Sequence, residues 1–159
     1  MSSRTGSLLV VDEWLLHDLM GDPRDQSNAY RFLTTLQRLP DRIVVADGSP
    51  WMGKAFTLMR DSGRLGRPEL RELSKLMHSV LRDLSSCLRI EAVEESQLNP
   101  DTAKLLPRKD LYLVETYLRS SADLLVTHDR RLLTALSQHC PQIATDTKAA
   151  FLAKYLSKV

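Results

Sequence analysis

Three aspartates stand at points where the polarity of the sequence changes abruptly. Asp12 follows the apolar run "SLLVV", Asp129 follows "LLVTH", and Asp110 begins the amphipathic segment "KDLYLVETYLRSS". Clustered carboxylates repel one another, so such a group is tolerated mainly when a cation lies among them. Mg²⁺ and Mn²⁺ prefer oxygen ligands, usually a few carboxylates together with water and substrate phosphates. Together these residues could therefore support metal-assisted attack of water on a phosphodiester.

Each of these aspartates also has a purely structural interpretation. Asp12 could cap a helix that begins at Trp14, and Asp129 could cap the helix that follows it. Asp110 could favour the positive amino terminus of its own helix. For any one of them alone, capping is the more common role. The chemical interpretation depends on all three meeting at the same edge of one sheet.

The elements that would position these residues alternate between strands and helices. Four apolar runs and one weaker run predict strands: "SLLVV", "RIVVA", "LLV" before Thr127, "QIAT" before Asp146 and, more weakly, "LRIEAV" at 88–93. Segments of helical period lie between and after them: "WLLHDLM", "SNAYRFLTTLQRL" with Ser27 as N-cap, "PWMGKAFTLMRDSG", "RPELRELSKLMHSVLRDLSSCL", "KDLYLVETYLRSS", "RRLLTALSQH" and "DTKAAFLAKYL".

This alternation predicts an α/β fold. We expect a three-layer α/β/α sandwich around a mostly parallel sheet of four or five strands, with "GRLGRP" at 63–68 as a turn between two helices. The whole chain, residues 1–159, would form a single domain. Ligands of such folds bind outside the carboxyl ends of the strands, where Asp12, Asp47 and Asp129 would lie.

The amino-acid composition indicates the general class of protein but says little about its function. With 43% hydrophobic and 26% charged residues the chain is typical of a soluble globular domain. A net charge of +2 permits a nucleic-acid partner without requiring one. Cys87 and Cys140 lack metal-ligand spacing and suit a reducing compartment. No apolar run approaches membrane-spanning length, so we expect a cytoplasmic protein that does not enter the membrane.

Three segments carry a resemblance to a known family. Taken in order, "LLVVDEWLL", "KDLYLVETYLRSSADLLVTHD" and "IATDTKAAFLAKYL" resemble a PIN-domain nuclease over nearly the whole chain. In that family one aspartate ends the first strand and a second starts the helix before the fourth strand. A third aspartate follows a "V-T-x-D" strand end. Asp12, Asp110 and Asp129 fall on these three places.

The resemblance implies a function and its components. It implies a metal-dependent endoribonuclease for single-stranded or loop RNA, in which Asp12, Asp110 and Asp129 hold Mg²⁺ or Mn²⁺. It also implies a toxin–antitoxin pair in which a small antitoxin-like protein covers the cleft. An apolar groove between the helices at 51–62 and 67–87 would then receive that partner, or a second copy in a homodimer.

The sequence departs from the family pattern in two places. The family usually has a glutamate in the helix after the second strand, where this chain has Met52, Gly53 and Lys54. Asp47 could replace it as a metal ligand, although "ADGSP" is also an ordinary turn sequence. The acid often found just after the third aspartate is replaced by arginine. These departures keep open an alternative, a catalytically inactive PIN-like module that binds RNA or a protein.

Further residues could contact substrate around the same edge. The Thr127 hydroxyl could position Asp129 or a bound water, and His128 could touch the substrate. Five basic residues could neutralise RNA phosphates, although solvated helix faces explain them nearly as well; these are Lys54, Arg108, Lys109, Arg130 and Arg131. We expect Glu13 to face solvent. Trp14 and Trp51 could stack on an unpaired base, although packing is the commoner role of such residues.

Overall fold

The computed structural model describes residues 6–64, 68–91 and 96–158, and its centre is a sheet of five parallel strands. The strand order is β3-β2-β1-β4-β5. The strands are β1 (Leu8–Val11), β2 (Arg42–Ala46), β3 (Cys87–Ile90), β4 (Leu124–Thr127) and β5 (Thr145–Thr147). In the middle of the sheet Val11 lies opposite Val126, so the carboxyl ends of β1 and β4 meet. The predicted α/β class with a parallel sheet is confirmed.

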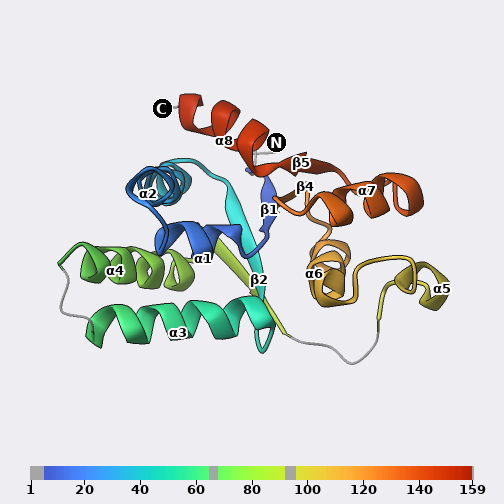
Figure 1. Cartoon of the computed structure of the whole chain (residues 1–159), viewed down its shortest axis with the longest axis horizontal. Helices are drawn as coiled ribbons and strands as arrows, with labels where there is room; N and C mark the ends of the chain where they lie inside the picture. Colours follow the sequence, from blue (N-terminus) through green and yellow to red (C-terminus); the bar gives the residue numbers. More distant parts are fainter. Residues whose placement is uncertain (1–5, 65–67, 92–95, 159) are drawn as a thin grey trace, which may run out of the picture.

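Helices cover both faces of this sheet, as Figure 1 shows. They are α1 (Trp14–Leu19), α2 (Pro23–Arg38), α3 (Pro50–Arg64), α4 (Pro68–Arg82), α5 (Pro100–Ala103), α6 (Leu111–Ser120), α7 (Arg130–His139) and α8 (Lys148–Tyr155), with 3₁₀ turns η1 (Arg108–Asp110) and η2 (Leu156–Lys158). Side chains alternate along a strand. Leu9 and Val11 accordingly pack with α1, α2, α3, α4 and α8, whereas Val10 packs with α6 and α7. The result is the expected three-layer sandwich.

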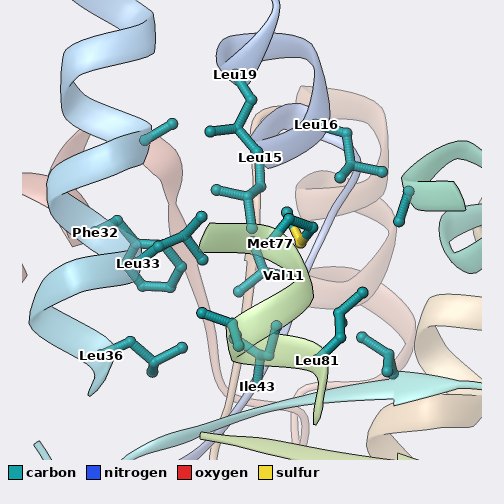
Figure 2. Packing of buried hydrophobic residues seen from close by; sticks show 14 of the residues in the cluster. Val11, Leu15, Leu16, Leu19, Phe32, Leu33, Leu36, Ile43, Met77 and Leu81 are labelled. Carbon is teal, nitrogen blue, oxygen red and sulfur yellow. The ribbon is translucent and has the colours of Figure 1, made fainter. Parts of the chain in front are cut away.

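The larger of the two cores lies under α1, α2 and α4. Figure 2 shows Phe32 and Leu33 of α2 meeting Leu15 of α1 and Met77 of α4 above the sheet. Phe32, Leu15, Leu33 and Met77 are fully buried. This packing holds α1 rigidly after the end of β1, which is the point where Asp12 lies.

Several helix boundaries differ from those predicted. The helix α2 begins at Pro23, earlier than Ser27, because Asp22 accepts a hydrogen bond from the Asp25 amide at 2.9 Å and Pro23 occupies the first turn. The helix α4 ends at Arg82, so Leu84 is not part of its apolar stripe and is 79% exposed. Asp83 there accepts hydrogen bonds from the amide and hydroxyl of Ser85, at 2.9 and 2.6 Å, which favours a turn.

Other segments were shifted, missed, or lie outside the described residues. The strand β5 starts after most of "QIAT" and includes Asp146. The short helix α5 was not predicted. Residues 65–67 of the predicted turn at 63–68, and the end of the predicted strand at 88–93, lie outside the described residues.

The helices α3 and α4 pack directly against each other, where an apolar groove was predicted. Ser74 of α4 donates a hydrogen bond to the Met59 carbonyl of α3 at 3.2 Å, and Met59 and Leu73 are buried. In the described part of the chain, no helix is both long and apolar enough to cross a membrane.

Candidate functional site

Asp12 is held rigidly at the end of β1. Its amide continues the sheet by donating to the Val126 carbonyl at 3.0 Å, and its side chain is buried. One carboxylate oxygen, Oδ1, accepts the Glu13 amide at 2.6 Å, and the other, Oδ2, accepts the Thr127 hydroxyl at 2.6 Å. The N-cap residue of α1 is Glu13, so the carboxylate of Asp12 is not the helix cap that one interpretation expected. Each of its oxygens keeps a lone pair for a further ligand.

Asp110 reaches the same place from the 3₁₀ turn η1, just before α6. Its side chain is only 4% exposed, and its Oδ2 has no hydrogen-bond partner. Burial, followed by the negative charges of Asp12 and Asp129, raises the pKa of Asp110 to about 6; Lys109 opposes this, and a side-chain hydrogen bond with Asp129 adds to it. A buried carboxylate oxygen without a hydrogen-bond partner carries a free-energy cost, because it has lost its water without regaining a hydrogen bond.

Asp129 caps α7 and also faces the cleft. Its Oδ1 accepts the amides of Arg131 at 2.9 Å and Leu132 at 3.4 Å, and its Oδ2 lies 3.5 Å from the Lys109 ammonium. Burial by itself would raise the pKa of Asp129, but the two amides and Lys109 together outweigh it and the pKa is lowered. The lowered pKa of Asp129 and the raised pKa of Asp110 mean that Asp110 is protonated more readily than Asp129.

Thr127 connects two of these aspartates and is fully buried. Its hydroxyl donates to Asp12 Oδ2 and accepts the Asp129 amide at 3.0 Å. These contacts agree with the prediction that the Thr127 hydroxyl positions Asp129. The side chain has no access to solvent, which argues against the predicted contact of Thr127 with substrate.

Glu13 was expected to face solvent but lines the cleft instead. Its side chain is 17% exposed, forms an ion pair with Lys54 of α3, and accepts the Tyr112 hydroxyl of α6 at 2.8 Å. Burial opposes ionisation, but the hydrogen bonds from Lys54 and Tyr112 outweigh it and lower the pKa of Glu13. The position of Glu13 directly after Asp12 was a local sequence signal that it could lie near the cleft. No local sequence signal indicated its hydrogen bond with Tyr112, which lies 99 residues later in the chain.

These residues line one cleft of about 660 Å³ at the carboxyl end of the sheet. Its walls are Asp12, Glu13, Trp14, His17, Pro50, Lys54, Lys109, Asp110, His128 and Asp129. The three aspartates selected from the sequence are thus together, with Lys54, Lys109 and His128. The acidic side chains of the cleft offer carboxylate oxygens, and hard cations such as Mg²⁺ and Mn²⁺ prefer oxygen ligands.

The carboxylates do not converge on one point. Among the described residues, no three Asp, Glu, His or Cys side chains stand together in the geometry of a metal site. A cation would therefore require at least one carboxylate of the cleft to rotate. If Asp129 rotates, it would give up its hydrogen bond to the Arg131 amide and its ion pair with Lys109.

Several predicted site residues lie elsewhere. Asp47 does not line the cleft, because it forms a 2.6 Å ion pair with Arg89 of the neighbouring strand β3 and is half exposed. Arg108, Arg130 and Arg131 are exposed and outside the cleft wall, although the amide of Arg131 binds Asp129.

Both tryptophans are buried in the core. Trp14 contributes to the wall of the cleft but donates its ring N–H to the Val126 carbonyl at 3.1 Å. Trp51 belongs to the first turn of α3. Neither ring is free to stack on a base.

Comparison of the chain with protein-family models, curated proteins and solved structures finds no match.

Proposed function

We propose that the protein is a divalent-metal-dependent endoribonuclease of the PIN-domain type that cleaves single-stranded or loop RNA. The observation that carries the proposal is the buried Asp110, whose Oδ2 lacks a partner in a cleft that also contains Asp12 and Asp129. Buried polar groups are nearly always hydrogen-bonded, so a buried carboxylate oxygen without a partner, in a cleft with two further aspartates, supports a role in binding a cation.

The order of elements supports the same proposal. Asp12 follows β1, Asp110 begins the helix that precedes β4, and Asp129 lies just beyond β4. These are the places that the resemblance to PIN domains assigns to its three aspartates. The side chains come from three separate segments, so their meeting in one cleft is a property of the tertiary structure.

The ligands of Mg²⁺ or Mn²⁺ would be Asp12, Asp110 and Asp129. The cation, when bound, would supply acidity to a water molecule and neutralise charge on a phosphate. Thr127 and the Glu13 amide orient Asp12. Lys54 and Lys109 bring positive charge to the wall of the cleft, where an RNA phosphate would need it. Asp47 is not included among the ligands because Arg89 holds it elsewhere.

One observation favours a second candidate, an inactive PIN-like module that binds RNA or a protein. Lys54 occupies the region where the family has an acid, and its ammonium pairs with Glu13 inside the cleft. A lysine there lowers the negative potential that would attract a cation. We rank this candidate second because it does not explain the unpartnered Asp110.

Cleavage of labelled single-stranded RNA by the purified protein would test both candidates. We expect cutting with Mn²⁺ or Mg²⁺, none with EDTA, and none in Asp12→Asn or Asp129→Asn. The matched control is Asp47→Asn, a carboxylate at the same edge of the sheet but outside the cleft. RNA binding without cutting at any metal concentration would favour the inactive module.

The implied partners extend the proposal. A small antitoxin-like protein or a second copy of the chain would associate with this nuclease in the cytoplasm. Sedimentation of the purified protein, alone and after co-expression with genes adjacent to its own, would test these two associations.

A further inference from the structure

A second groove runs between α2 and α8, next to the cleft. These helices lie side by side, as Figure 1 shows. Arg24, Asn28 and Arg31 of α2 belong to one wall, and residues of α8 and η2, beginning with Lys148, form the other, around a volume of about 580 Å³.

The charge of this groove is predominantly positive. Arg24 and Arg31 are exposed, and within the described ranges neither has an ion-pair partner. The two arginines are seven positions apart in the sequence, so they project from the same face of α2 about 10 Å apart along its axis, with Asn28 between them. Asp25 is the one acid that lines the groove, while Lys148 pairs with Asp18 at 2.6 Å.

The groove and the cleft approach each other at Lys148, which lines the groove, and Trp14, which lines the cleft. The Lys148 ammonium lies 5.8 Å from the centre of the Trp14 ring, and Trp14 lines the cleft. Lys148 also anchors α8 to α1 through Asp18. An extended ligand that leaves the cleft over α1 would therefore meet Lys148 and then the arginines of α2.

We propose that this groove binds the phosphodiester backbone of the RNA strand whose scissile phosphate lies in the cleft. The inference rests on the proposed nuclease function. Arg24 and Arg31 contact successive parts of the backbone, and Asn28 bonds to sugar or phosphate oxygens between them. The subsite extends the substrate class to strands long enough to pass from the cleft across α1.

An acidic peptide is the competing occupant; the α8 wall offers it the small or largely buried apolar residues Ala149, Leu152 and Ala153, with Leu156 beyond, but no exposed large apolar side chain. Protein docking usually depends on apolar or aromatic anchors. The exposed large apolar side chains of the described chain, Met20, Tyr30, Phe56, Leu84 and Leu105, all lie outside the walls of this groove. Two unpaired guanidinium groups in one row match a repeating polyanion better.

The test is fluorescence anisotropy of a labelled oligouridylate of about 16 nucleotides with the full chain in EDTA, which prevents cutting. Removal of two phosphate contacts in the double variant Arg24→Ala/Arg31→Ala should weaken binding about 25-fold at about 0.1 M salt and reduce the salt slope by about 1.4. The matched control, Arg71→Ala/Arg82→Ala, removes the same charge from exposed positions of α4 and should weaken binding no more than about twofold.

The outcomes separate this inference from the nuclease proposal. Equal loss of affinity in the two double variants would overturn the subsite. Tighter binding of a polyglutamate peptide than of RNA, lost in Arg24→Ala/Arg31→Ala, would overturn it in favour of an acidic protein partner. If the unmodified protein cuts RNA but its affinity is indifferent to Arg24 and Arg31, the subsite fails and the nuclease stands. If it does not cut but binding depends on these arginines, the subsite stands as an RNA-binding groove and the nuclease fails.

Discussion

The amino edge and the carboxyl edge of the sheet each contain a buried aspartate, and the hydrogen bonding of the two carboxylates differs. At the amino edge, Asp41 is 7% exposed, and its two oxygens accept the Ser7 amide at 2.8 Å and the Tyr155 hydroxyl at 2.9 Å. At the carboxyl edge, Asp110 is 4% exposed and its Oδ2 has no partner. Burial is nearly equal for the two acids. They differ in whether both carboxylate oxygens have a hydrogen-bond partner, and this difference is what the proposed function draws on.

The presence of a cleft also does not separate the two groups of acids. The amino edge has its own cleft of about 510 Å³, lined by Asp41, Asp123 and Asp146 among others. There, however, Asp123 accepts the Leu8 amide at 2.8 Å, and Asp146 accepts the Thr147 amide at 2.9 Å and lies 3.7 Å from the Lys154 ammonium. The hydrogen bonds and the ion pair of these acids stabilise the strand ends and the C-terminal helix. The same residue type thus serves stability at one edge and is left available at the other.

The largest expected effect contrasts the two edges in catalysis. Asp110→Asn should lower kcat/KM for RNA cleavage by about 10²–10³-fold, because it removes a charge that the transition state requires. Asp41→Ala should leave kcat/KM within about threefold once the protein is folded, since it lies at the opposite edge. Cleavage assays with Mn²⁺ at a fixed temperature measure both. Comparable losses in the two variants would contradict the assignment.

The reverse contrast is expected in stability. Asp41→Ala should lower the free energy of unfolding by about 2–3 kcal/mol, because the Ser7 amide and the Tyr155 hydroxyl lose their acceptor. Asp110→Asn should cost nothing or be stabilising, since it replaces an unpartnered charge with a neutral group of the same shape. Urea denaturation at neutral pH measures both. A stability loss in Asp110→Asn as large as that in Asp41→Ala would show that Asp110 is structural.

The raised pKa of Asp110 predicts an unusual pH dependence. Its pKa is about 6 in the fold against 3.8 in the unfolded chain, so between those values the folded state binds more protons than the unfolded state. Stability from this group is therefore present below about pH 4 and decreases as the pH rises through 6, by about 2 kcal/mol. Urea denaturation of wild type and Asp110→Asn in EDTA, from pH 4 to 7, isolates the effect as a difference. Parallel curves for the two proteins would refute it.

Thr127→Val tests the connection between Asp12 and Asp129. The change removes the hydroxyl and preserves the side-chain shape, so we expect a loss of about 1–2 kcal/mol in stability. Cleavage should fall by about tenfold through misplacement of Asp12, as for other residues that orient ligands. Thr127→Ser, which keeps the hydroxyl, should restore most of the activity. Failure of serine to rescue would indicate that the methyl packing of Thr127 matters more than its hydrogen bonds.

The smallest effect is expected at Asp47. Its ion pair with Arg89 is half exposed, and such pairs contribute about 0–1 kcal/mol. Asp47→Asn should therefore change both stability and cleavage only marginally, as measured by urea denaturation and kcat/KM. A large loss of cleavage would return Asp47 to the set of metal ligands.

Local sequence determined the succession of strands and helices along the chain and the positions of the aspartates relative to them. The apolar runs before Asp12 and Asp129 predicted β1 and β4, because a short buried strand bounded by a polar residue leaves a local pattern. Helical periodicity likewise predicted α3, α6, α7 and α8. Parallel strands then implied that Asp12 and Asp129 would meet at one edge.

Tertiary structure decided how each acid is partnered. Thr127 reaches Asp12 across 115 residues and Tyr112 reaches Glu13 across 99, distances over which no local pattern operates. Arg89 draws Asp47 away from the cleft because β2 and β3 happen to be neighbours. Hydrogen bonds and ion pairs depend on the final packing of side chains, whereas strand and helix signals depend on residues close in sequence. The sequence could therefore place the carboxylates at an edge, but only the packed fold left Asp110 without a partner there.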